Sequence, residues 1–254
     1  MNENLNDFKN FGLKLIEKSS VIIKKYYRKK IKIENKNDYS PVTRADKYTE
    51  KIIKKMILKE YPHHGVLGEE LGEINSSAVY KWVIDPIDGT KTFISGVPLF
   101  GTLIALLKDE TPIMGIINLP ILGETLIGDG FSTVLNGNRT YIRPCNSISN
   151  AVLLTTDLEN IRIYSNINKF MNLVNKVKLF RTWGDCYGYY LLSTGYADIM
   201  IDPIMSSWDL LALIPIINGA GGVITDFSGN NPISSNSIIA SSKLIHEELI
   251  MLLN

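Results

Sequence analysis

Cysteine and histidine are scarce in this sequence, with two cysteines and three histidines among 254 residues. The two cysteines, Cys145 and Cys186, form no metal-ligand pattern, and so few of them favour a reduced, cytoplasmic protein. The histidines form no metal-ligand arrangement either. His63 and His64 follow Pro62 in a predicted loop, so we expect them at the surface.

An excess of charge of one sign is also missing. The 27 basic residues balance 26 acidic ones to a net charge of +1, which argues against nucleic acid or an acidic membrane as the main partner. No apolar run is long enough to span a bilayer, and no apolar signal region opens the sequence, so we expect a soluble protein. The hydrophobic content of 45% is ample for one large domain or two closely packed halves.

Several catalytic motifs are absent as well. The sequence has no Walker A loop, no Gly-x-Ser-x-Gly elbow and no strong sign of a Ser/His/Asp or cysteine nucleophile. The acidic residues are therefore the main candidates for chemistry.

The spacing of apolar residues predicts a first helix over about 5–28 and a second between Thr43 and Tyr61. Short apolar strands follow at 83–84, 101–107, 113–118 and 124–128. Two hairpin turns are expected at 128–130 and 136–138. The second half alternates instead, with strands at 152–154, 197–201, 223–226 and 237–241 and helices at 184–194, 208–219 and 242–253. We expect one domain, with an α+β half over about 1–140 and an α/β half over about 141–254.

The most informative segment is Asp85-Pro86-Ile87-Asp88-Gly89-Thr90, which directly follows an apolar strand. Pro86 stiffens the turn, so both aspartates and the Ile87 carbonyl can converge. Hard oxygen ligands of this kind suit Mg²⁺. The backbone N–H groups of Gly89 and Thr90 could hold a phosphate beside it. An ordinary Asp-Pro…Asp-Gly surface turn has the same composition.

Two further acidic clusters strengthen the metal interpretation. Glu69 and Glu70 lie just upstream, and Asp209 follows Trp208 far downstream, at the start of an apolar helical stretch. Together with Asp85 and Asp88 they could bind two or three divalent ions, an arrangement suited to phosphate ester hydrolysis.

These motifs, Gly68-Glu69-Glu70, Trp82 to Thr90 with Phe93, and Trp208-Asp209 through Ala220-Gly221-Gly222, resemble the signatures of the inositol monophosphatase superfamily. The resemblance spans roughly residues 5–252. It implies a Mg²⁺-dependent, lithium-sensitive phosphatase, usually dimeric, built as a five-layered αβαβα sandwich with its site between the halves.

The resemblance also implies roles for individual residues. Glu69, Asp85 and the Ile87 carbonyl hold one Mg²⁺, while Asp85, Asp88 and Asp209 hold a second, and Glu69 can share a third. Glu70 has either a supporting role or none.

The attacking water is expected to be activated by Thr90 together with Asp46, and Gly89 and Thr90 hold the phosphate. Without the resemblance, Asp46 also fits a first-turn helix residue favoured by the helix dipole.

A narrower resemblance connects the sequence with the histidinol-phosphate phosphatase branch, which acts in histidine biosynthesis. Its signature comprises Phe93 to Leu99, Arg181 to Tyr189, and Ala197 to Pro203. Carboxylates at Asp185, Asp202 and Asp209 would favour a leaving group with an ammonium and an imidazole. Arg181 could contact phosphate within one molecule or across a dimer, or pair with Asp185.

Three functions therefore stay open. The first is Mg²⁺-dependent hydrolysis of histidinol phosphate. The second is the same chemistry on inositol 1-phosphate, a sugar bisphosphate or a 3′-phosphorylated nucleotide. The third is a catalytically silent phosphate-binding scaffold, against which the intact acidic set argues.

Overall fold

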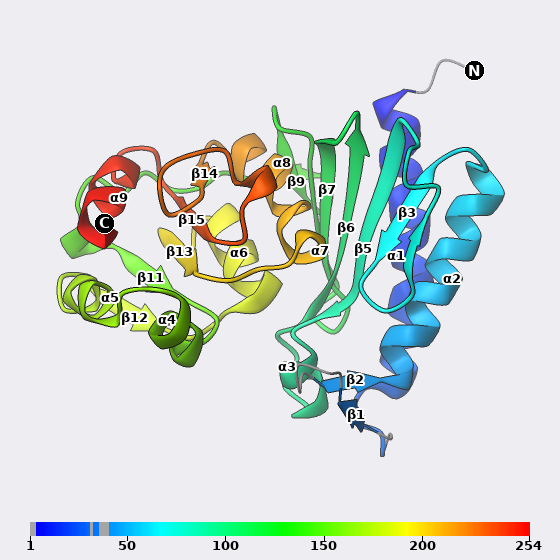
Figure 1. Ribbon diagram of the computed structural model, residues 1–254, viewed down its shortest axis with the longest axis horizontal. Coiled ribbons are helices and arrows are strands. Elements are labelled where there is room, and N and C mark those ends of the chain that lie inside the picture. The colour runs from blue at the N-terminus through cyan, green and yellow to red at the C-terminus, as the bar shows by residue number, and fades with distance from the viewer. Residues whose placement is uncertain (1–3, 31–32, 36–40) are drawn as a thin grey trace.

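The computed structural model describes residues 4–30, 33–35 and 41–254. Over these residues the chain forms five layers in the order helix, sheet, helix, sheet and helix (Figure 1), which confirms the expected sandwich. The first layer, at the right of Figure 1, consists of α1 (Leu5–Tyr26) and α2 (Arg44–Glu60). The predicted first helix is thus confirmed, ending two residues earlier than expected.

Both helices of the first layer begin at side-chain caps. The Asn4 carboxamide accepts a hydrogen bond from the backbone N–H of Asn6 (3.1 Å), which satisfies one of the free donors at the start of α1. In α2, Thr43 and Asp46 form a reciprocal capping box. The cap holds Asp46 buried at the first turn of α2, at the end of the helix that faces the candidate site.

The second layer is a mostly antiparallel sheet. Within the described ranges its strands are β3 (Gly65–Gly68), β4 (Gly72–Ile74), β5 (Tyr80–Asp88), β6 (Gly101–Lys108), β7 (Thr111–Leu119), β8 (Glu124–Gly128), β9 (Thr133–Leu135) and β10 (Asn138–Arg139). They lie in the order β10-β9-β8-β7-β6-β5-β3-β4, and β3 pairs with β5 in parallel. A short antiparallel pair of β1 (Ile33–Asn35) and β2 (Pro41–Thr43) and the helix α3 (Thr90–Ile94) lie at one end of this layer (Figure 1).

Both faces of the large sheet are covered, which explains why its central strands are almost continuously apolar. On β5, Trp82 and Ile84 pack against α1 and α2, whereas Val83 faces the opposite way into the core between the sheets. The same alternation applies to β6, where Ile104 and Leu103 belong to different cores.

The remaining layers come from the second half of the chain. The middle layer contains α6 (Asp185–Ser193), α7 (Ser207–Leu210) and α8 (Leu213–Gly219). The smaller sheet contains β11 (Val152–Leu154), β12 (Leu179–Arg181), β13 (Ile199–Asp202), β14 (Val223–Thr225) and β15 (Ile238–Ser241), in the order β12-β11-β13-β15-β14. Its outer face is covered by α4 (Leu158–Tyr164), α5 (Ile167–Val174) and α9 (His246–Leu253) (Figure 1).

The middle helices approach the large sheet closely because two of its residues are glycines. A Cβ on Gly115 of β7 would lie 1.9 Å from the Ala212 carbonyl oxygen, and one on Gly128 of β8 would lie 2.4 Å from the Cα of Ile216. The predicted helix over 208–219 is wrong as a single helix. It divides into α7 and α8, because Pro215 has no N–H to continue the helical hydrogen bonds.

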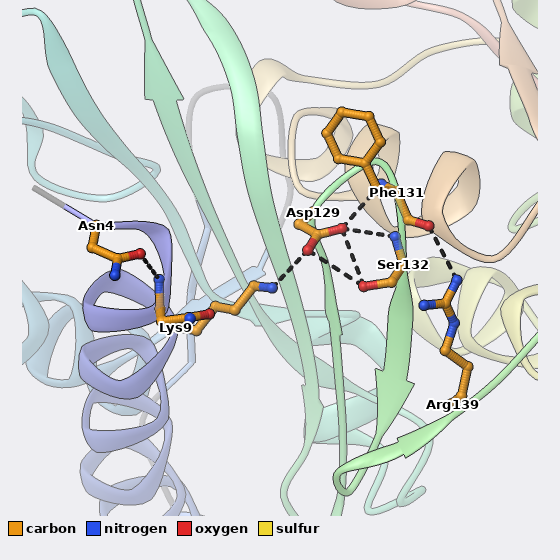
Figure 2. A network of polar contacts seen from close by, with 7 residues as sticks. Asn4, Lys9, Asp129, Phe131, Ser132 and Arg139 are labelled. Carbon is orange, nitrogen blue, oxygen red and sulfur yellow. Dashed lines mark hydrogen bonds and ion pairs between the residues drawn. The ribbon is translucent and has the colours of Figure 1, made fainter.

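A polar network joins α1 to the turn after β8, as Figure 2 shows. The Lys9 ammonium lies 2.6 Å from the Asp129 carboxylate, which accepts hydrogen bonds from the backbone N–H groups of Phe131 (3.0 Å) and Ser132 (2.7 Å). Arg139 donates to the Phe131 carbonyl (3.2 Å). The predicted turn at 128–130 is therefore confirmed and is tied to a helix of the first layer.

One expectation about the surface is wrong. His64 is buried, and its Nδ1 accepts a hydrogen bond from the Trp82 indole N–H (3.1 Å). Its ring stacks on Tyr61 and Tyr80, so the surrounding aromatic side chains exclude it from solvent. No helix in the described ranges is both long enough and apolar enough to cross a membrane.

Candidate active site

The end of β5 carries the first part of the site. Aspartates three positions apart would face opposite sides of a regular strand. The pairing with β6 shifts between Asp85 and Asp88, however, so that Asp85 lies opposite Leu103 and Asp88 lies opposite Gly101. This bulge brings both carboxylates to the same side of the sheet. The Asp85 carboxylate also accepts a hydrogen bond from the Ile87 N–H (2.9 Å), which stabilises the turn.

Asp209 completes an acidic cluster from the other half of the chain. It lies in the first turn of α7, where it forms a capping box with Ser206. Carboxylate oxygens of Asp85, Asp88 and Asp209 lie within 4.8 Å of one another. Asp85 is buried, and the other two are half-buried. Glu69, which follows β3, lines the same cleft of about 1140 Å³ as Asp88 and Asp209.

The pKa values of the cluster are raised. Burial, and then the negative charges of Glu69, Asp88 and Asp209, hold the pKa of Asp85 well above its usual range. Burial also raises the pKa of Asp88 well above its usual range, and the charges of Asp185 and Asp209 add to it. Burial and the Glu69 charge raise the pKa of Asp209 to about 7. The bare site therefore binds protons that a cation would displace.

This donor set fits a hard divalent cation. All the side-chain donors are carboxylate oxygens, which Mg²⁺ prefers, and their mutual repulsion is relieved by positive charge. Asp85, Asp88, Asp209 and Glu69 would hold the ion or ions. The Ile87 carbonyl, the backbone ligand expected from the resemblance, accepts a hydrogen bond from the Thr90 hydroxyl (3.0 Å).

Asp46 and Thr90 lie beside this cluster. The Thr90 hydroxyl lies 3.4 Å from one Asp46 oxygen, and the other Asp46 oxygen accepts bonds from the Thr43 hydroxyl (2.5 Å) and backbone N–H (2.9 Å). Burial raises the pKa of Asp46 despite these bonds, and the charge of Glu69 raises it further. The structure thus brings Asp46, Thr90 and Glu69 into one neighbourhood from α2, α3 and the β3–β4 connection.

Gly89, the residue before α3, lines the cleft next to Thr90. Its φ of 84° is in the left-handed region, and a Cβ there would lie 2.8 Å from the Asp185 carboxylate. Glycine is therefore required both for the turn and for the close approach of the second half of the chain.

The predicted substrate residues divide into two groups. Asp185, Asp202 and Asp209 line the cleft. Arg181 lies outside its lining, with its guanidinium 6.0 Å from the centre of the Trp183 ring and donating to the Phe180 carbonyl (2.7 Å). Trp183 itself is half-exposed and lines the cleft.

Asp185 and Asp202 are held in place by the same threonine. The Thr156 hydroxyl accepts a hydrogen bond from the Asp185 N–H (2.9 Å) and donates to the Asp202 carboxylate (3.1 Å). Tyr189 also donates to Asp202 (2.9 Å). Burial raises the pKa of Asp202 to about 7, against the opposing effect of these bonds. Asp185 has a φ of 49°, a strained conformation of the kind found at functional sites.

Sequence reasoning missed Thr156, Asp157 and Asn160, which also line the cleft. Thr156 and Asp157 follow β11, and Asp202 ends β13, the strand that pairs with β11 in parallel. The ends of parallel neighbours meet at one edge of a sheet, so this pairing was the signal that could have found them. Asp157 also caps α4 by accepting from the Glu159 N–H (2.8 Å).

The raised pKa values predict how pH affects the stability of the metal-free protein. The unfolded chain releases the protons of Asp202 and Asp209 near pH 3.8, whereas the folded protein keeps these groups protonated until their pKa of about 7. The free energy of unfolding should therefore fall as pH rises from about 4 to about 7. His246, whose burial lowers its pKa from 6.5 to about 4, opposes this trend over most of that range, from about pH 4 to pH 6.5.

Thermal unfolding in EDTA at pH 5 and pH 7.5 tests the fall in stability of the metal-free protein. The same measurement in Mg²⁺ tests whether protons and the cation compete for the carboxylates. We expect Mg²⁺ to raise Tm more at pH 7.5, where fewer protons compete for the carboxylates. An equal rise in Tm on adding Mg²⁺ at both pH values would contradict this competition.

Comparisons with known proteins agree with this geometry. The model of the inositol monophosphatase family matches residues 4–254. The bifunctional phosphatase IMPL2, chloroplastic, of Arabidopsis thaliana is 43% identical over 94% of this chain and 70% of that protein. A histidinol-phosphatase of Chlorobaculum parvum is 35% identical over 94% of this chain and 93% of that protein.

Solved structures agree as well. An inositol monophosphatase from Zymomonas mobilis, 33% identical, matches with a TM-score of 0.88 over 99% of both chains. The carboxylate cluster, the five-layered fold and these likenesses lead to one conclusion: the chain is a member of the inositol monophosphatase family of phosphatases.

Proposed function

We propose that this chain is a Mg²⁺-dependent phosphatase that hydrolyses L-histidinol phosphate to L-histidinol and phosphate in histidine biosynthesis. The observation that carries the proposal is a second acidic wall in the cleft. Asp157, Asp185 and Asp202 line it together with the exposed ring of Trp183, beside the carboxylates proposed to bind the metal. Such a wall favours a leaving group that is cationic and aromatic.

The residues of the site have distinct tasks in this proposal. Glu69, Asp85, Asp88 and Asp209 would bind Mg²⁺, which neutralises phosphate charge and makes water a better nucleophile. Asp46 and Thr90 orient the water. The Asp46 carboxylate accepts its proton. The backbone N–H groups of Gly89 and Thr90 hold the phosphate.

The cationic end of the substrate gives the acidic wall its role. The ammonium of histidinol can donate to carboxylates, and its imidazole can stack on Trp183. The named likeness to the histidinol-phosphatase of Chlorobaculum parvum supports this choice. Arg181 stays a candidate for a phosphate contact supplied from a second copy, since it lies outside the cleft of its own chain.

Inositol 1-phosphate is the second candidate substrate. It is favoured by the likeness to the inositol monophosphatase of Zymomonas mobilis and by the hydroxyl-binding capacity of Asp202 and Asp209. A polyol brings no cationic group of its own to the acidic wall, where Lys91 lies 3.7 Å from Asp157, and this makes it the weaker candidate.

Phosphate release from the two esters, each with Mg²⁺ and with EDTA, decides between them. We expect Mg²⁺-dependent release with a strong preference for L-histidinol phosphate. A preference for inositol 1-phosphate would keep the metal site and refute the substrate. Release from neither ester would call for a wider panel and favour a silent phosphate-binding protein.

The proposal extends to two or three Mg²⁺ ions per site, a cytoplasmic location and a homodimer. The number of ions follows from the family resemblance and from the charge of the carboxylate cluster, which exceeds what one divalent cation neutralises. The homodimer follows from the family resemblance, and the cytoplasmic location from the small number of cysteines.

A further inference from the structure

Glu50 is a charged side chain buried beside the candidate site. It lies one turn after Asp46 on α2 and has no solvent exposure. One of its carboxylate oxygens accepts a hydrogen bond from the backbone N–H of Glu70 (2.7 Å), and the other accepts one from Leu71 (2.9 Å). Both donors belong to the connection between β3 and β4, directly after Glu69.

Lys54 completes the contact one turn further along α2. Its ammonium lies 3.0 Å from the Glu50 carboxylate and donates to the Gly72 carbonyl (2.5 Å), and the side chain is nearly fully buried. The two residues thus hold backbone groups of three successive residues, Glu70, Leu71 and Gly72, from one helix.

Gly68 allows this contact. A Cβ at Gly68 would lie 2.0 Å from a Glu50 oxygen, so the carboxylate packs directly against the last residue of β3. On the other side, the Glu69 N–H donates to the Ile84 carbonyl of β5 (3.2 Å). The N–H of Glu69 is therefore held by β5, and the next N–H along the chain, that of Glu70, is held by Glu50.

A buried ion pair is a poor way to add stability, because removing both charges from water costs as much as their attraction returns. The contribution of this ion pair is to fix the orientation of the backbone around Glu69. Each hydrogen bond to Glu50 fixes one peptide group, and together they set where the Glu69 side chain begins. An apolar pair of the same size would fill the space and leave those peptide groups free to shift.

We propose that Glu50 is a positioning residue that holds Glu69 in the orientation needed to share a divalent cation with Asp85. The inference rests on the proposed metal-dependent function. Because Asp46 and Glu50 are four residues apart on one face of α2, the same helix also sets the spacing between the water-orienting carboxylate and the metal ligand.

Glu50→Gln tests this, because the amide keeps one acceptor oxygen, turns an NH₂ donor toward the other backbone N–H and carries no charge to pair with Lys54. Calorimetric titration of the substrate-free protein with Mn²⁺ should show binding weakened by about 10- to 100-fold, as for other outer partners of metal ligands. Hydrogen exchange at the amides of Glu70 and Leu71 should be faster in the metal-free variant. In phosphate release, the Mg²⁺ concentration for half activation should rise, with a much smaller change in kcat at saturating Mg²⁺.

Glu60→Gln, the same substitution at an exposed position of α2, is the matched control and should change none of these values. Glu50→Asp is the second variant in case the glutamine protein does not fold. It keeps the charge but is too short to reach both amides, so it should weaken Mn²⁺ binding in the same direction.

The outcomes separate the two proposals. Wild-type protein that binds no Mn²⁺ and releases phosphate equally in EDTA overturns the proposed function. Wild-type protein that needs the metal, with unchanged Mn²⁺ affinity and amide exchange in Glu50→Gln or in Glu50→Asp, overturns the role of Glu50 alone.

Discussion

Replacing Asp88 with asparagine is expected to lower kcat/KM for phosphate release by roughly 10³-fold or more. This exceeds the loss of about 10–100-fold that is typical for residues that contact a metal ligand rather than the metal itself. Asp88 ends β5 at the bulge and shares its neighbourhood with Asp85 and Asp209. Asparagine keeps the shape and an oxygen but loses the negative charge that a divalent cation requires. The measurement is phosphate release at saturating Mg²⁺.

The same variant should remain folded, and in EDTA it should be at least as stable as the wild type. Burial and neighbouring charges hold the pKa of Asp88 well above its usual range, so the folded metal-free protein carries a repulsion that asparagine removes. The Cys186 N–H, which donates to Asp88, can still donate to the amide oxygen. Circular dichroism and thermal unfolding in EDTA check this.

Asp129→Asn is the matched control for Asp88→Asn. Asp129 lies in the turn after β8 and pairs with Lys9, away from the cleft lining (Figure 2). We expect normal phosphate release and a small loss of stability in that variant. Near-normal activity in Asp88→Asn would remove the metal assignment from the end of β5.

The second large effect is expected at Asp46 and Thr90, which should act as one unit. Asp46→Asn and Thr90→Val should each lower kcat by about 10²–10⁴-fold, the usual contribution of a positioned acid or base. The double variant should be little slower than either single variant, because each substitution already breaks the same proton path between two oxygens 3.4 Å apart.

Single-turnover rates at saturating substrate and Mg²⁺ give the comparison. Thr90→Ser retains the hydroxyl and should keep most of the activity, which separates loss of the hydroxyl from loss of shape. Losses that multiply in the double variant would show that Asp46 and Thr90 act independently. In that case Asp46 is better explained as the capping residue of α2, which its bonds to Thr43 also support.

Local features were readable from the sequence because they depend on near neighbours. The helix over about 5–28, the turn at 128–130 and the strand over 101–107 follow from apolar spacing and turn residues, and the structure confirms them with small changes of boundary. The turn beginning at Asp85 was also readable, since Pro86 and Gly89 restrict it directly. The metal and substrate roles of these residues stay predictions.

Contacts between distant segments were not readable in this way. Asp209 is more than a hundred residues from Asp85. Their acidic character suggested a shared metal site and the family resemblance supported it, but the structure was needed to show their carboxylates together. His64 looked like a surface residue of a loop until the aromatic side chains around it were seen. Glu50 and Lys54 have the spacing of an ordinary solvated helix pair, and nothing local indicates that both are buried.

By itself, then, the sequence determined many of the helices and strands, the acidic turn at the end of β5 and, through its motifs, the family. These depend on backbone restrictions and side-chain periodicity within a few residues. Tertiary structure alone decided the bulge that turns Asp85 and Asp88 to one side and the close approach of α8 to Gly128. It also decided the acidic wall, which brings Asp185 of α6 together with residues that follow β11 and end β13. Those features arise where two sheets and the helices between them pack together. Packing brings together residues that are far apart in the sequence, and the local sequence around each does not show which ones will meet.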